Sequence, residues 1–116
     1  MERRVPALVA AMAQWDVYPN PSARSREDMP YLVDLQSNLL DVLPTRLVAP
    51  LVRSRLAPDG LPHALCPTFS IDGVALVLLP HEAGPIEARL LKRRNSSLLA
   101  HAHDIVGALD AVVSGF

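Results

Sequence analysis

Four histidines and one cysteine are the side chains of this sequence with the most common metal-binding and catalytic chemistry. His101 and His103 lie two residues apart in a stretch with helical periodicity, so they point to different sides and cannot chelate one ion. His63 and His81 fall in separate loop segments, and no cysteine stands at ligand spacing from them. The sequence therefore predicts no metal site.

Nucleophilic catalysis has no better candidate. Cys66 is followed by Pro67 and has no histidine within a recognisable motif, which favours a buried structural thiol. No G-x-S-x-G motif occurs, and the five glycines form no phosphate-cradling loop of the usual kinds. We therefore expect no catalytic residue and no cofactor, and this favours a protein-binding function.

Charge argues against a grip on nucleic acid. The chain has eleven basic and twelve acidic residues, for a net charge of −1, whereas a protein that holds a phosphate backbone usually has a basic excess. The basic run Lys92-Arg93-Arg94 has no aromatic residue within it, so we interpret it as a solvated connector. We expect a protein or small-molecule partner.

Length and composition limit the possible folds and indicate the cellular compartment. With 116 residues the chain makes one compact domain, and its eleven prolines argue against an all-helical fold. The lone Cys66 excludes a disulfide framework, and no apolar run is long enough to span a membrane, so we expect a cytoplasmic protein. Residues 1–12 have a basic start, but Pro6 shortens their apolar stretch below that of a signal peptide. We interpret 1–12 as a disordered N-terminal extension, with Met1 or Met12 as the natural start, and 13–116 as the domain.

Two extended segments in the middle of the chain must position whatever the protein binds with. Residues 31–36 alternate with period two, which predicts a strand with one apolar and one mixed face. Residues 46–51 are apolar except for Arg46, which predicts a strand buried on both faces. Asn38, Asp41 and Pro44 give the segment between them turn chemistry.

Further strands are expected on either side of this pair. Residues 14–18 predict a strand that ends at Pro19, and the exposed loop 22–28 that follows has partner binding as its functional alternative. Asp72-Gly73 lies between apolar runs, which strongly indicates a β-hairpin of residues 68–71 and 74–79. Two shorter segments are also expected to be extended, namely 62–66 and 86–90, with a helical turn as the alternative for the second.

From Ser97 onward the period becomes helical, and Ser96 or Ser97 can cap the start. The apolar stripe is wider than one sheet face requires, so it could serve a core and a subunit contact together. Its first row is Leu98, Ala102, Ile105, Leu109, Val112 and Phe116, and its second row is Leu99, Val106 and Val113.

The order of several short blocks resembles the signature of the CcdB toxin family, and the resemblance covers residues 13–116. The blocks, in chain order, are Gln14–Tyr18, Val33–Ser37, Leu40-Asp41, Arg46–Leu51, Asp104-Ile105, Ala108–Asp110 and Ser114–Phe116. The resemblance implies a mainly β protein with a C-terminal α-helix, an SH3-like small barrel of the CcdB/MazF toxin type.

Function and partners are also implied by the resemblance. CcdB-like toxins are homodimers that bind the DNA gyrase A subunit and trap its cleaved-DNA complex. An antitoxin with a disordered C-terminal segment neutralises them, and the pair regulates its own transcription. The family's killing residues are a terminal Trp-Gly-Ile, which match Ser114, Gly115 and Phe116 here. Ser114 replaces the tryptophan, so this sequence lacks the stacking of that ring on an arginine, which is worth about 0.5–2 kcal/mol.

Two other functions stay open. MazF-like endoribonucleases share a related fold, and Arg46, Arg53, Arg55 and His63 are the candidates here for binding a phosphate. A non-toxic chromosomal homologue that acts only as a protein-binding module is the second alternative.

Overall fold

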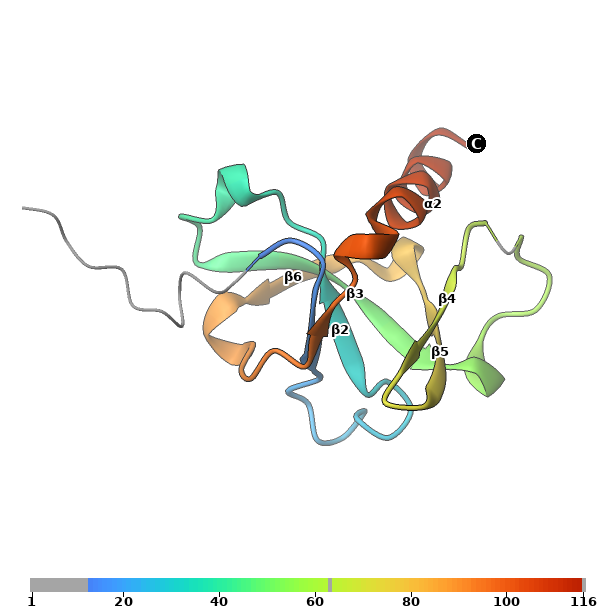
Figure 1. Cartoon of the computed structure of the whole chain (residues 1–116), viewed down its shortest axis with the longest axis horizontal. Coiled ribbons are helices and arrows are strands. Elements are labelled where there is room, and N and C mark those ends of the chain that lie inside the picture. The colour runs from blue at the N-terminus through green and yellow to red at the C-terminus, as the bar shows by residue number, and fades with distance from the viewer. Residues whose placement is uncertain (1–12, 63, 116) are drawn as a thin grey trace, which may run out of the picture.

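A single curled antiparallel sheet forms the body of the protein in the computed structural model, which describes residues 13–62 and 64–115 (Figure 1). Its order is β4-β5-β3-β2-β1-β7, and β6 pairs with β3 outside this path. The strands are β1 (Asp16–Pro19), β2 (Tyr31–Asp34), β3 (Thr45–Arg53), β4 (Thr68–Ile71), β5 (Val74–Leu78), β6 (Gly84–Glu87) and β7 (Ser96–Ser97). Helix α2 (Ala102–Ser114) follows, and 3-10 helices span Asn38–Leu40, Ser54–Leu56, Pro80–Glu82, Ala88–Leu90 and Leu99–His101.

The long strand β3 bends the sheet into a half-barrel. Its first half pairs with β6 and its second half with β5, while β2 pairs along the middle on the opposite edge. Pro50 lies between Val48, which faces Gly84, and Leu51, which faces Leu78. Proline cannot donate to a sheet ladder, and here it stands where β3 changes partner. This mainly β half-barrel with a C-terminal helix confirms the predicted SH3-like small-barrel fold.

The core lies on the concave side of the sheet and under the start of the helix. Alternate residues of β2 and β3, among them Val33, Ala49 and Leu51, point into this core and are completely buried. From the helix, Ile105 closes it. The strand predicted at 46–51 is therefore confirmed, except that Leu47 is 40% exposed.

The other face of β2 and β3 has the predicted mixed composition, and it is also covered. Tyr18, Leu32 and Val48 pack there with Leu91. The polar members of this face are buried too, since Asp34 is 0% and Gln36 is 7% exposed. The mixed composition of residues 31–36 thus reflects an internal polar network rather than a solvated face.

The β4–β5 hairpin confirms the prediction made from Asp72-Gly73. Both residues have positive φ angles, 52° and 79°, which is the requirement of a type I′ turn. Two other predictions need correction: the extended segment predicted at 62–66 was wrong, and the one predicted at 86–90 was half right. In the segment predicted at 62–66, residues 64–66 turn instead of extending, because Leu65 N–H donates to the Pro62 carbonyl at 3.0 Å. Residues 86–90 divide between the end of β6 and a 3-10 helix.

The C-terminal helix begins at Ala102 and not at Ser97. Ser96 and Ser97 form β7, which pairs with Val17 and Asp16 of β1. The Ser97 Oγ accepts the Leu99 N–H at 3.1 Å, but the N-cap residues are Leu98 for the 3-10 helix and His101 for α2, so the expected serine cap is not formed. Long-range strand pairing has overridden the helical periodicity at these two residues.

Candidate partner-binding surfaces

The second half of helix α2 leaves the sheet and is exposed to solvent. Ile105 and Ala108 are buried. Val113 lies more than one helical turn beyond Ala108 and is 86% exposed. In Figure 1 the C-terminal end of α2 lies away from the strands. The exposed apolar residues Leu99, Val106, Val112 and Val113 are called the helix surface below. They include the whole second row of the predicted stripe, which the sheet does not cover.

The residues predicted to bind gyrase lie at the end of this helix. Ser114 is its last residue and is exposed. Gly115 adopts φ 82° and donates its N–H to the Ala111 carbonyl at 2.9 Å, which closes the helix in the left-handed conformation that favours glycine. The structure thus places Ser114 and Gly115 side by side at an exposed end, while Phe116 lies outside the described residues.

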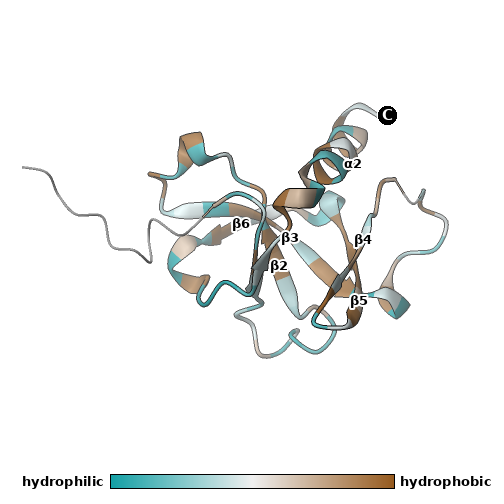
Figure 2. Ribbon diagram, viewed as in Figure 1, coloured by the Kyte–Doolittle hydropathy of each residue, from teal (hydrophilic) through white to brown (hydrophobic). Residues whose placement is uncertain are grey.

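A second apolar surface, not foreseen in the sequence, lies on the segment between β2 and β3. Leu39 is 90% and Val42 is 86% exposed. With Leu40, Leu43 and Leu47 they make up the loop surface, part of which is coloured as hydrophobic in Figure 2. The signal was the leucines and valine among turn residues, which were interpreted only as a connector. Exposed apolar clusters of this kind mark sites of protein interaction.

A buried polar network holds the loop surface in place. Asp34 accepts hydrogen bonds from Arg46 Nε at 2.9 Å and from the Gln36 N–H at 3.0 Å, and it forms an ion pair with Arg46 Nη2 at 2.8 Å. The Gln36 amide then donates to the carbonyls of Leu40 and Thr45 and accepts the Leu47 N–H, all within 3.0 Å. One side chain therefore ties both ends of the loop to the sheet.

Burial raises the pKa of Asp34, while the hydrogen bonds from Gln36 and Arg46 act in the opposite direction. Tyr18 lies in the same region, and its pKa is raised to about 12. Burial is the largest cause, followed by the nearby carboxylates of Asp16 and Asp34. These shifts belong to packed structural groups, and neither residue opens onto an exposed surface.

The arginines considered for phosphate binding do not converge. Arg46 is 2% exposed and paired with Asp34. The Nε of Arg53 donates to the Glu27 carbonyl at 2.6 Å, and Arg55 faces Asp28 at 3.5 Å. His63 lies outside the described residues. Within residues 13–62 and 64–115, no three acidic, histidine or cysteine residues gather as metal ligands, and no helix there could cross a membrane.

Fold and surfaces together define a small antiparallel half-barrel that carries a C-terminal helix with exposed apolar faces. The family model described as CcdB protein matches residues 14–115, and the chain belongs to this family of toxins from toxin–antitoxin modules. No curated protein matches the sequence.

Proposed function

We propose that this protein inhibits DNA gyrase as CcdB-like toxins do, by trapping the cleaved-DNA complex, and that an antitoxin neutralises it in the cytoplasm. The observation that carries the proposal is the free end of helix α2 on a chain of the CcdB family. Val113 and Ser114 are exposed there, and Gly115 ends the helix without a side chain. A backbone without Cβ can approach a partner closely.

The replacement of tryptophan by Ser114 changes how the contact is made. A serine cannot stack on an arginine, so the contact relies on Gly115 and Phe116, supported by Val112 and Val113, which are 40% and 86% exposed. Burying these side chains contributes roughly 25 cal/mol for each Å² removed from water. We therefore propose a weaker gyrase inhibitor than one that ends in Trp-Gly-Ile.

Purified gyrase tests the proposal directly. Full-length protein is added to gyrase and supercoiled DNA, and linear DNA is scored after the protein is removed. The full chain should produce breaks, and deletion of residues 114–116 should abolish them. Ser114→Trp should increase the breaks about three- to thirtyfold, which corresponds to about 0.7–2 kcal/mol of restored stacking. Ser114→Ala, which offers no ring, is the matched control and should behave like the parent protein.

A non-toxic binding module is the second candidate, and Ser114 is the observation that favours it. The same assay separates the two. If the full chain and Ser114→Trp both fail to produce breaks while circular dichroism shows a folded protein, gyrase is not the target. Co-purification with the product of the neighbouring gene then tests antitoxin binding independently, and no association at micromolar concentration would contradict a toxin–antitoxin pair.

A further inference from the structure

The two ends of the curled sheet leave an open strand edge. β4 stands at one end of the strand order and β7 at the other, so no described strand pairs with the outer edge of β4. A cavity of about 290 Å³ lies between the two ends, with Ser70 and Ile71 on one wall and Ser96 and Ser97 on the other. The half-barrel is therefore open along β4.

The register of the hairpin shows which backbone groups are free at that edge. Ile71 and Val74 flank the two-residue turn, and Phe69 pairs with Leu76. Because hydrogen-bonded and non-bonded pairs alternate along an antiparallel ladder, the N–H and C=O groups of Thr68 and Ser70 point away from β5. The hydrogen bond from Leu78 N–H to the Pro67 carbonyl, at 2.9 Å, fits this alternation.

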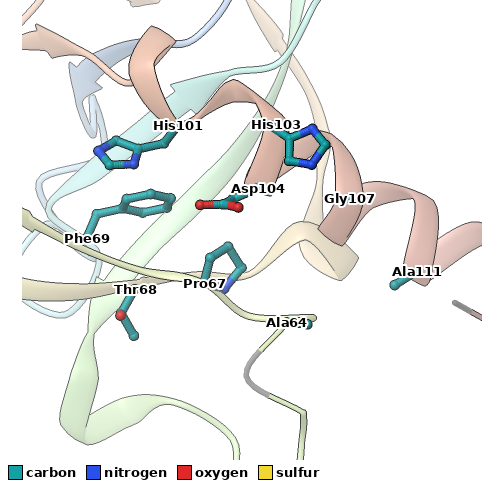
Figure 3. A pocket seen from close by; sticks show the side chains of 9 residues that line it. All are labelled: Ala64, Pro67, Thr68, Phe69, His101, His103, Asp104, Gly107 and Ala111. Carbon is teal, nitrogen blue, oxygen red and sulfur yellow. The ribbon is translucent and has the colours of Figure 1, made fainter.

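A larger cavity of about 790 Å³ continues along the same edge toward helix α2. Phe69 and Pro67 line one side, and Asp104 and Gly107 of the helix line the other (Figure 3). His101 belongs to both cavities, and its ring centre is 5.2 Å from that of Phe69. The two cavities adjoin at His101 along β4, and together they are called the edge groove below.

The polar groups of the edge groove indicate what would fill it. Asp104 lies toward one end and points from the helix toward β4 (Figure 3), and Asp72 lies toward the other end. Neither carboxylate pairs with a cation among the described residues, since Asp72 accepts only from Tyr31 and Asn95, at 3.2 and 3.0 Å. Ser96 Oγ is buried in the wall without a hydrogen-bond partner in the described part of the chain.

We propose that the edge groove binds an extended segment of another protein, which adds as a strand to β4 and carries a basic residue at each end. Main-chain hydrogen bonds to Thr68 and Ser70 supply the affinity, as they do in other complexes formed by strand addition. A four-residue strand such as β4 spans roughly 13 Å. The two basic residues of the bound segment are therefore separated by about four residues, and they face Asp72 and Asp104. This surface is separate from the end of α2 and does not depend on gyrase.

The probe is a displayed library of random twelve-residue peptides, selected on the full-length protein. Ser70→Pro removes the outward N–H but not a bond to β5, because proline is tolerated where a strand's N–H faces solvent. Ser70→Ala keeps the N–H and is its control. An enriched peptide should bind Ser70→Pro at least tenfold more weakly and Ser70→Ala as the parent protein. Asp104→Asn should weaken binding severalfold and reduce its salt dependence, whereas Asp110→Asn on the same helix should not.

Chemical changes in the peptide test the geometry without altering the protein. Methylating the peptide nitrogens that face β4 should weaken binding at least tenfold, and methylating the alternate nitrogens should not. The proposal is overturned if no peptide is enriched. It is also overturned if the peptide binds Ser70→Pro and Ser70→Ala equally well and the two sets of methylated peptides bind equally well. It is also overturned if Ser70→Pro, but not Ser70→Ala, turns a dimer into a monomer, because the groove would then hold a second copy of this chain.

Discussion

Asp34 and Arg46 form an ion pair in which neither side chain exceeds 2% exposure. Taking two charges out of water is costly, and their attraction offsets this cost only while both partners are present. The pair also fixes Gln36, whose N–H donates to Asp34, and through Gln36 the loop surface. These two residues therefore connect the packing of the sheet to the shape of an exposed surface.

Replacing Asp34 with asparagine should destabilise the fold strongly. The guanidinium of Arg46 would stay buried without its counter-charge, and losing one partner of a buried pair costs about 3–5 kcal/mol. Urea unfolding measures the change. Asp28→Asn is the matched control, because Asp28 and Arg55 are more than 60% exposed and such pairs contribute about 0–1 kcal/mol. Equal losses in the two variants would contradict the assigned role of the buried pair.

Tyr18 should make stability depend on pH in the alkaline range. Burial, followed by the charges of Asp16 and Asp34, raises its pKa from 10.0 to about 12. The folded protein thus holds the phenolic proton more tightly than the unfolded chain does. The resulting stabilisation, about 3 kcal/mol for a shift of this size, is complete below pH 10 and is lost as the pH rises through about 12.

Urea unfolding across this range checks the pH dependence. Tyr18→Phe should show a much smaller decline, because it has no proton to lose. Burial also raises the pKa of Tyr31, so Tyr31→Phe serves as the comparison and should keep most of the parent protein's decline. Parallel declines in the parent protein and Tyr18→Phe would show that other groups cause the alkaline loss.

The two halves of helix α2 should respond differently to truncation of their side chains. Ile105 is 0% exposed and belongs to the main core, so Ile105→Ala should cost about 2–5 kcal/mol of unfolding free energy. Val113 is 86% exposed, and Val113→Ala should change stability by less than about 0.5 kcal/mol. Thermal and urea unfolding measure both. A large loss in Val113→Ala would mean that another chain covers Val113 during the measurement.

Elements with local signals were predictable from sequence, and those decided by distant partners were not. Asp72-Gly73 determines its hairpin through the φ angles of two adjacent residues. Ser96 and Ser97 carry no such signal, because their strand exists only through pairing with Asp16 and Val17. The helix start was misplaced for this reason, and the burial of Asp34 was missed because its partner Arg46 comes from another strand.

The candidate site divides in the same way. Ser114, Gly115 and Phe116 came from the family resemblance, and the structure adds that the first two lie at an exposed helix end. The loop surface escaped prediction because Leu39 and Val42 lie among turn residues, where exposure depends on what the sheet covers. The edge groove needs the strand order, which periodicity does not give.

At the scale of the whole molecule, we expect a homodimer in which Leu99 and Val106 of the helix surface form the subunit contact. Light scattering at micromolar concentration should give twice the chain mass of 12.6 kDa. Val106→Asp places a charge in the proposed contact and should yield the monomer mass. Leu39→Asp is the matched control on the loop surface, where the residue is 90% exposed, and should remain a dimer. A monomer for the parent protein would contradict the assembly.

The pairing of β1 with β7 also bears on when this protein can fold. The β2–β3 and β4–β5 pairs join neighbours in the chain, whereas Asp16 and Ser97 come from nearly opposite ends of the described residues. Closing so long a loop carries a larger entropic cost than closing a hairpin, and contacts of this range slow folding. During synthesis, β1 leaves the ribosome before its partner β7, and helix α2 emerges after all the strands of the sheet. A nascent chain therefore cannot complete its sheet until Ser97 has left the ribosome, so a ribosome that stalls before this point releases no folded toxin.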